Sequence, residues 1–157
     1  MPVGSERPLV KLPHTFRPLG VRVAAYAFGA MLLLVCAVMW FAFPPEIRDK
    51  FTAFQVGTIV VLGGGAAVCG FALARCRVVA RAESLTVVNG YKVRRYDWNQ
   101  VLAVSLRPGS PWVTLDLSDG STVPAMGIQG SDGGRAMRQV RQLRALVAQQ
   151  SRTDRND

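Results

Sequence analysis

Residues that commonly build catalytic or metal sites are scarce in this sequence. The 157 residues include one histidine, His14, and three cysteines, Cys36, Cys69 and Cys76. No spacing among the cysteines is typical of a zinc site or a redox pair. A catalytic site needs a nucleophile with a base, paired carboxylates or a metal cluster, and no histidine follows residue 14. We therefore expect no enzymatic activity, no cofactor and no metal.

Charge is absent from two long stretches, Val23–Phe43 and Phe51–Ala74, which also lack proline. About 20 apolar residues suffice for a helix to span a bilayer. The first stretch is longer than the apolar part of a signal peptide and has no cleavage site after it. The rest of the chain is too small to bury two helices that are apolar on all sides. We predict a transmembrane hairpin over residues 21–74, with spans at about 22–43 and 52–74.

Basic residues flank these spans unequally, within a net charge of +9. The short loop between the spans has two basic residues, Arg48 and Lys50, balanced by two acids. The flanks are richer in basic residues: Arg7, Lys11, Arg17 and Arg22 precede the first span, and Arg75, Arg77, Arg81, Lys92 and Arg94 follow the second. Because positive loops stay in the cytoplasm, we expect a multi-pass protein of the cell membrane with both termini cytoplasmic.

Small residues recur at spacings of four in both spans, at Ala25 and Gly29 and within the run Leu62–Gly70. Such spacing lets helix backbones approach closely in lipid. Two interpretations remain open: the spans pack on each other as a hairpin, which we favour, or they present a face for a homodimer.

The residues outside the spans divide into three segments. Residues 1–20 contain four prolines, which disfavour a helix, and we interpret them as a cytoplasmic tail. Residues 75–150 read as about six short strands in meander order and then one helix, 135–149, capped by Ser131 or Asp132. Residues 151–157 form a polar tail.

The segment Asn89–Trp98, with sequence NGYKVRRYDW, is the most informative part of this domain. An Asn-Gly pair between β-branched runs is a strong hairpin signal. We predict a two-residue turn at Asn89 and Gly90 that pairs 85–88 with 91–94.

Two spans, a strand–Asn-Gly–basic strand–Trp segment and the later pattern W-x-x-L-x-L-x-D-G of Trp112–Gly120 together resemble a known family. The chain is similar, over residues 22–150, to bacterial pleckstrin-homology-like (PH-like) membrane proteins of the actinobacterial low molecular weight protein antigen 6 type. This resemblance implies an α+β fold, in which the transmembrane hairpin precedes a small curved antiparallel sheet with a C-terminal helix. PH-like domains usually have seven strands, so a seventh is expected from a split at VRRYDW or from the residues after Met126.

The basic residues Lys92, Arg94, Arg95 and Arg77 are the candidate binding residues. They would face anionic lipid headgroups of the bilayer or a protein partner. Alternatively, the strand merely displays a polar face, or the protein is a small accessory subunit that acts through its transmembrane hairpin. Nucleic acid is not expected, since the 13 basic and 7 acidic residues from Arg75 onward are a weak electrostatic footprint.

Overall fold

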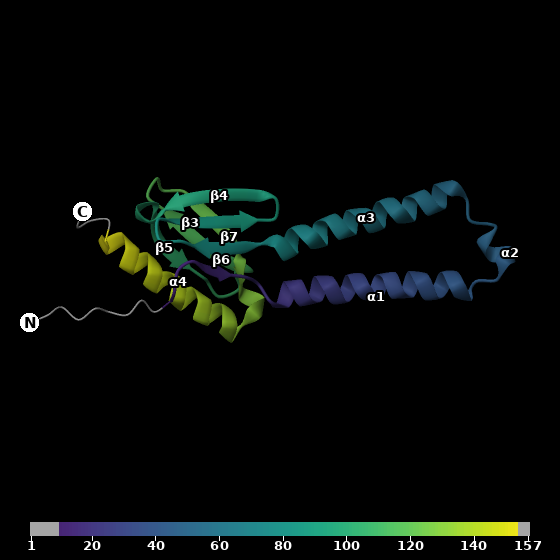
Figure 1. The fold of residues 1–157 in the computed structure, drawn as a ribbon, viewed down its shortest axis with the longest axis horizontal. Helices are drawn as coiled ribbons and strands as arrows, with labels where there is room; N and C mark the ends of the chain where they lie inside the picture. Colours follow the sequence, from purple (N-terminus) through teal and green to yellow (C-terminus); the bar gives the residue numbers. More distant parts are fainter. Residues whose placement is uncertain (1–9, 154–157) are drawn as a thin grey trace, which may run out of the picture. The chain divides into compact units, whose positions relative to one another are not determined.

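The computed structural model describes residues 10–153 (Figure 1). The chain forms two compact units. One is helical and covers Gly20–Ala74, and the other combines the residues up to Leu19 with those from Arg75 onward.

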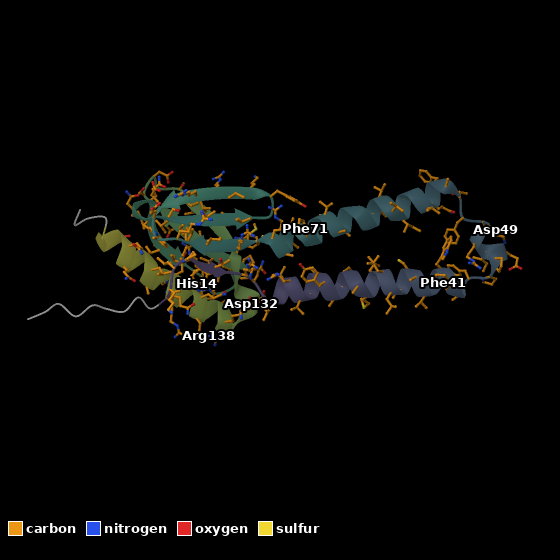
Figure 2. The ribbon with its side chains drawn as sticks, in the orientation of Figure 1. His14, Phe41, Asp49, Phe71, Asp132 and Arg138 are labelled. Carbon is orange, nitrogen blue, oxygen red and sulfur yellow. The ribbon has the colours of Figure 1, made fainter. Side chains whose placement is uncertain are left out.

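The helical unit consists of two long helices and a short one, and Figure 2 shows their side chains. Helices α1 (Gly20–Ala42) and α3 (Ala53–Arg75) each have 23 residues, with mean hydropathies of 2.2 and 2.0. Both are long and apolar enough to cross a membrane. The turn between them contains helix α2 (Pro45–Arg48). A capping box precedes and begins α3. The Thr52 N–H donates to Gln55 Oε1 at 3.0 Å, and the Gln55 N–H donates to Thr52 Oγ1 at 3.3 Å.

Contact between the two long helices is local. A Cβ added at Gly70 would lie 4.0 Å from Cβ of Ala25, an ordinary van der Waals contact. A Cβ added at Gly63, Gly64 or Gly65 would meet nothing within 4 Å. Ala25 and Gly70 thus lie close to each other, and the choice between hairpin packing and a homodimer face stays a prediction.

The second unit contains two antiparallel sheets and a helix, as predicted for the fold class. The first sheet has strand order β1-β2-β3-β4 and the second has order β5-β6-β7. The strands are β1 (His14–Phe16), β2 (Arg77–Ala80), β3 (Ser84–Asn89), β4 (Lys92–Asp97), β5 (Val101–Ser105), β6 (Trp112–Leu117) and β7 (Thr122–Gln129). The short 3-10 helices η1 (Trp98–Gln100) and η2 (Gly130–Asp132) follow β4 and β7, and α4 (Gly134–Thr153) ends the described chain.

Strand β1 corrects the prediction of a tail over residues 1–20, of which residues 1–9 lie outside the described part. His14 pairs with Ala80 and Phe16 with Val78, and the Phe16 side chain is fully buried. The seventh strand thus comes from before the long helices, and neither from VRRYDW nor from a separate strand after Met126. A strand of three residues is too short to show the alternation of apolar and polar residues that identifies a strand in a sequence. Its stability comes from its pairing with β2 and from burial of Phe16. Helices α1–α3 are consequently an insertion between two adjacent strands of one sheet.

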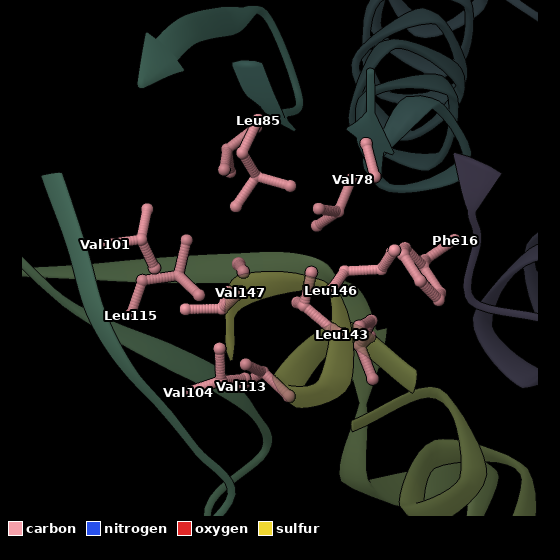
Figure 3. Packing of buried hydrophobic residues seen from close by; sticks show 14 of the residues in the cluster. Phe16, Val78, Leu85, Val101, Val104, Val113, Leu115, Leu143, Leu146 and Val147 are labelled. Carbon is pink, nitrogen blue, oxygen red and sulfur yellow. The ribbon is translucent and has the colours of Figure 1, made fainter. Parts of the chain in front are cut away.

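The core lies between the two sheets and α4 (Figure 3). Val78 and Leu85 of the first sheet, Leu115 of the second and Leu143 of α4 are all inaccessible to solvent. Trp98 is also buried, and its indole N–H donates to the carbonyls of Arg81 and Ala82 at 3.0 and 3.1 Å. The core thus joins α4 to both sheets.

Helix α4 confirms the predicted C-terminal helix, but its cap differs from the prediction. Ser131 and Asp132 lie in η2, and Gly133, with φ 54°, separates them from α4. One carboxylate oxygen of Asp132 instead accepts a hydrogen bond of 2.8 Å from the backbone N–H of Leu19. This bond ties the residue before α1 to the C-terminal part of the domain.

Candidate functional site

The β3–β4 hairpin turns at Gly90 and Tyr91. Asn89 pairs with Lys92, and Val88 pairs with Val93. The predicted turn at Asn89 and Gly90 is therefore wrong by one position. The predicted pairing of the strands is wrong by two residues, because Val88 pairs with Val93 and not with Tyr91. Gly90 has a φ of 61°, which fits the type II′ turn with glycine at its first central position.

A long-range interaction of Asn89 explains the difference. Its side-chain Nδ2 donates to the Pro124 carbonyl at 2.6 Å, and its Oδ1 accepts from the Met126 N–H at 3.0 Å. Both partners belong to β7 of the second sheet. Asn89 thus ends β3 as a strand residue and joins the two sheets, which outweighs its local preference for a turn.

The register of β3 and β4 separates the four predicted binding residues into two groups. The pairing continues without a shift from Ser84–Asp97 to Asn89–Lys92, so no bulge brings Arg94 and Arg95 to one side. Cross-strand partners point to the same face of a sheet. Lys92 and Arg94 share the face of Leu85 and Val87, which points toward the core. Arg95 and Arg77 lie on the opposite face, across from Thr86 and Val88.

Lys92 and Arg94 line a cleft of about 220 Å³ between β4 and the start of β7. Its lining residues are Val87, Asn89, Lys92, Arg94, Thr122, Val123 and Pro124. Val87 and Val123 are buried, whereas Lys92, Arg94 and Thr122 are exposed. The floor of the cleft is thus apolar, and two cationic side chains and a hydroxyl surround it. None of the lining residues named here is acidic. Such a cleft suits an anionic group of small size.

Arg95 and Arg77 have other surroundings. Arg95 Nη2 lies 3.9 Å from Glu83 Oε2, and both side chains are exposed, so the pair contributes little to stability. Arg77 is half-buried, and its backbone lies against Gly127 of β7. The structure therefore brings together two of the four predicted residues and adds Asn89 and Thr122, which sequence reasoning missed.

The β3–β4 turn lies beside Arg75 and Cys76, which belong to the same compact unit. The Gly90 N–H donates to Sγ of Cys76 at 3.2 Å, and the Arg75 guanidinium lies 5.6 Å from the centroid of the Tyr91 ring. Arg75 is the last residue of α3. The Cys76 thiol is buried, with 1% of the residue exposed, as expected for a structural cysteine.

The acidic residues of the described part of the chain do not meet the needs of a metal site. Within residues 10–153, no group of three or more His, Cys, Asp or Glu residues is placed to hold a metal ion. Asp119 accepts a 2.8 Å hydrogen bond from the Ser121 N–H in the β6–β7 turn. Hydrogen bonds from the side chain and backbone of Ser121 lower the pKa of Asp119, because they favour its charged form.

Comparison with known proteins gives a family match and several curated relatives. Residues 75–146 match the bacterial PH domain family. Uncharacterised proteins of Mycobacterium bovis and Mycobacterium tuberculosis are 30% identical to this chain over 115 residues, which is 71% of this chain and 75% of each relative. No solved structure matches the chain.

Proposed function

We propose that this chain, which belongs to one family with the uncharacterised mycobacterial relatives and matches the bacterial PH domain family over residues 75–146, is a membrane-anchored, non-catalytic binding module. A PH-like domain together with two helices long enough to cross a membrane fits a membrane-associated interaction module. Its finer role is contact between the cleft and the anionic headgroups of the bilayer that α1 and α3 span.

The position of the cleft carries this proposal. Asn89 and Lys92 flank the turn that is hydrogen-bonded to Cys76, the residue directly after α3. Arg94 lies two residues further along β4, and a strand advances about 3.3 Å per residue. Both cations are thus within reach of headgroups at the end of α3. Each basic residue near an anionic leaflet contributes about 1 kcal/mol, and screening over about 8 Å limits the attraction to the nearest ones.

The proposed orientation has both termini and the PH-like domain in the cytoplasm. The basic residues on both flanks of the helical unit support it, and so does the insertion of α1–α3 between β1 and β2, since both strands must lie on one side of the membrane.

Cysteine labelling in intact cells tests this orientation. Cys36 and Cys69 are first replaced by alanine, while Cys76 stays because it is buried. We expect the variant Ile47→Cys, in the α2 turn, to react with a membrane-impermeant maleimide. Arg107→Cys, at an exposed position after β5, should react only after lysis. Labelling of Arg107→Cys from outside would overturn the orientation.

Charge reversal tests the cleft. The full chain in neutral detergent receives short-chain phosphatidylglycerol or, for comparison, short-chain phosphatidylcholine. A ligand that binds only the folded state raises stability with its concentration, by about 2.7 kcal/mol at 100 times its Kd. We expect phosphatidylglycerol alone to raise the Tm of the domain, and Lys92→Glu with Arg94→Glu to abolish the rise. The rise should also shrink at high salt.

A matched control has the same change in charge elsewhere. Arg138 and Arg141 are exposed on α4, outside the cleft, and reversing both should leave the rise in Tm intact. An equal loss in both double variants would reject the cleft as the site. An equal rise with free glycerol phosphate would identify a site for soluble anions instead of headgroups.

The second candidate function is that of an accessory subunit acting through α1 and α3. The observation that favours it is the open space at Gly63, Gly64 and Gly65, where an added Cβ would meet nothing within 4 Å and a partner helix could approach closely. Failure of phosphatidylglycerol to stabilise the parent chain at low salt would favour this function.

A further inference from the structure

Two exposed apolar side chains mark the β3–β4 turn. Tyr91 is 57% exposed and Val93 is 59% exposed; together they are called the hairpin tip below. Single exposed apolar residues are ordinary on protein surfaces. These two differ in their position and in their charged neighbours.

The hairpin tip is held at the point where α3 ends. The Gly90 N–H binds Sγ of Cys76, and the Tyr91 ring lies under the Arg75 guanidinium. Val93 lies across from Val88, which pairs in turn with Arg77. One residue, Cys76, separates α3 from β2. If α3 spans a bilayer, Gly90 and Tyr91 therefore contact the residues at which the chain leaves it, Arg75 and Cys76.

The composition of this region matches a membrane interface. Tyrosine is enriched at the headgroup level because its ring is apolar and its hydroxyl polar. Arg75 and Lys92 flank Tyr91, and the long aliphatic stems of such residues lie along apolar surface while their charges reach the headgroups. In the described part of the chain, the acidic residue closest in sequence to Tyr91 is Asp97, at the far end of β4.

We infer that the hairpin tip inserts into the interfacial zone of the leaflet in which α3 ends, with Tyr91 as an aromatic anchor. This inference rests on the proposed function, because it requires that α1 and α3 cross the membrane. It adds an apolar contact to the electrostatic one, and this contact does not depend on anionic lipid. Within the PH-like domain, the β2–β3 turn at Arg81–Glu83 is at the opposite end of β2 and β3 from this contact.

Quenching by brominated lipid tests the inference in the full chain, reconstituted into discs of neutral phosphatidylcholine. Trp40, in α1, is replaced by phenylalanine to remove its emission from the lipid region. Tyr91→Trp then reports at the tip, and Val93→Trp provides a second reporter there. Ala82→Trp is the matched control, because Ala82 is exposed in the β2–β3 turn, beyond Ala80, which lies about 10 Å along β2 from Arg77 at 3.3 Å per residue.

We expect acyl-brominated lipid to reduce the emission of Tyr91→Trp and Val93→Trp relative to plain discs, and to leave that of Ala82→Trp unchanged. Aqueous acrylamide should quench in the reverse order. Equal quenching by brominated lipid at positions 82, 91 and 93 would overturn the inference. Since the discs contain no anionic lipid, this result is independent of the charge reversal in the cleft. If the tip lies outside the bilayer but phosphatidylglycerol still raises the Tm, the insertion of the tip is rejected and the proposed function is not.

Discussion

Replacing Gly127 with valine is expected to unfold the PH-like domain. A Cβ at this position would lie 2.5 Å from the carbonyl carbon of Arg77 and 2.6 Å from Arg77 Cα and Val78 N. All three are backbone atoms of β2, which is paired with β1 on one side and β3 on the other. β2 cannot move away without breaking one of these pairings. The free energy of unfolding should therefore fall by about 3 kcal/mol or more, the upper end of the range for overpacked cores.

The measurement is thermal or urea unfolding in detergent of the full chain with Trp40 replaced by phenylalanine, followed by the emission of the two tryptophans of the domain, of which Trp98 is buried. Gly134→Ala is the control, because the nearest atom to its added Cβ is Arg138 Nη1 at 3.8 Å and alanine is favoured in a helix. We expect this control to unfold at or slightly above the parent midpoint. A Gly127→Val variant that unfolds with the parent would mean that β2 and β7 are not in contact as described.

Excision of the helical unit is expected to leave a folded domain only if β1 is retained. Phe16 and Val78 are paired, and Leu19 and Arg75 each lie three residues from that pair, so a short Gly-Ser linker can replace residues 20–74. Such a joined chain should fold in solution. The fragment 75–157 should not, because it lacks the partner of β2 and the buried Phe16 ring, whose removal alone costs about 3–5 kcal/mol.

Amide hydrogen exchange and the dispersion of the backbone NMR spectrum distinguish these results. The joined chain should show protected amides in β2 and β3, and Phe16→Ala in the joined chain should reduce that protection toward the level of the fragment. Equal protection in the fragment and in the joined chain would show that β1 is dispensable.

The sequence by itself determined the two long apolar helices, the amphipathic C-terminal helix and the presence of six strands. The helices follow from local composition: no charge interrupts Val23–Phe43 or Phe51–Ala74, and the apolar stripe of α4 repeats at helical spacing. Helix η1 also has a local cause, because Asp97 and Gln100 form a capping box there. These features depend on residues within a few positions of one another.

Only the tertiary structure decided where in the chain the first strand lies, what register the β3–β4 hairpin has and which residues line the cleft. Phe16 and Val78 are partners across an inserted helical unit, and Asn89 binds the backbone of Pro124 and Met126. Because of these hydrogen bonds of Asn89, the turn lies at Gly90 and Tyr91, and Lys92 lines the same cleft as Thr122 of β7. No local pattern distinguishes Gly127 from other glycines, since its role comes from the backbone of Arg77 against it. Strand pairing and close backbone contact join residues far apart in the chain, so their free energy is absent from any short stretch of sequence.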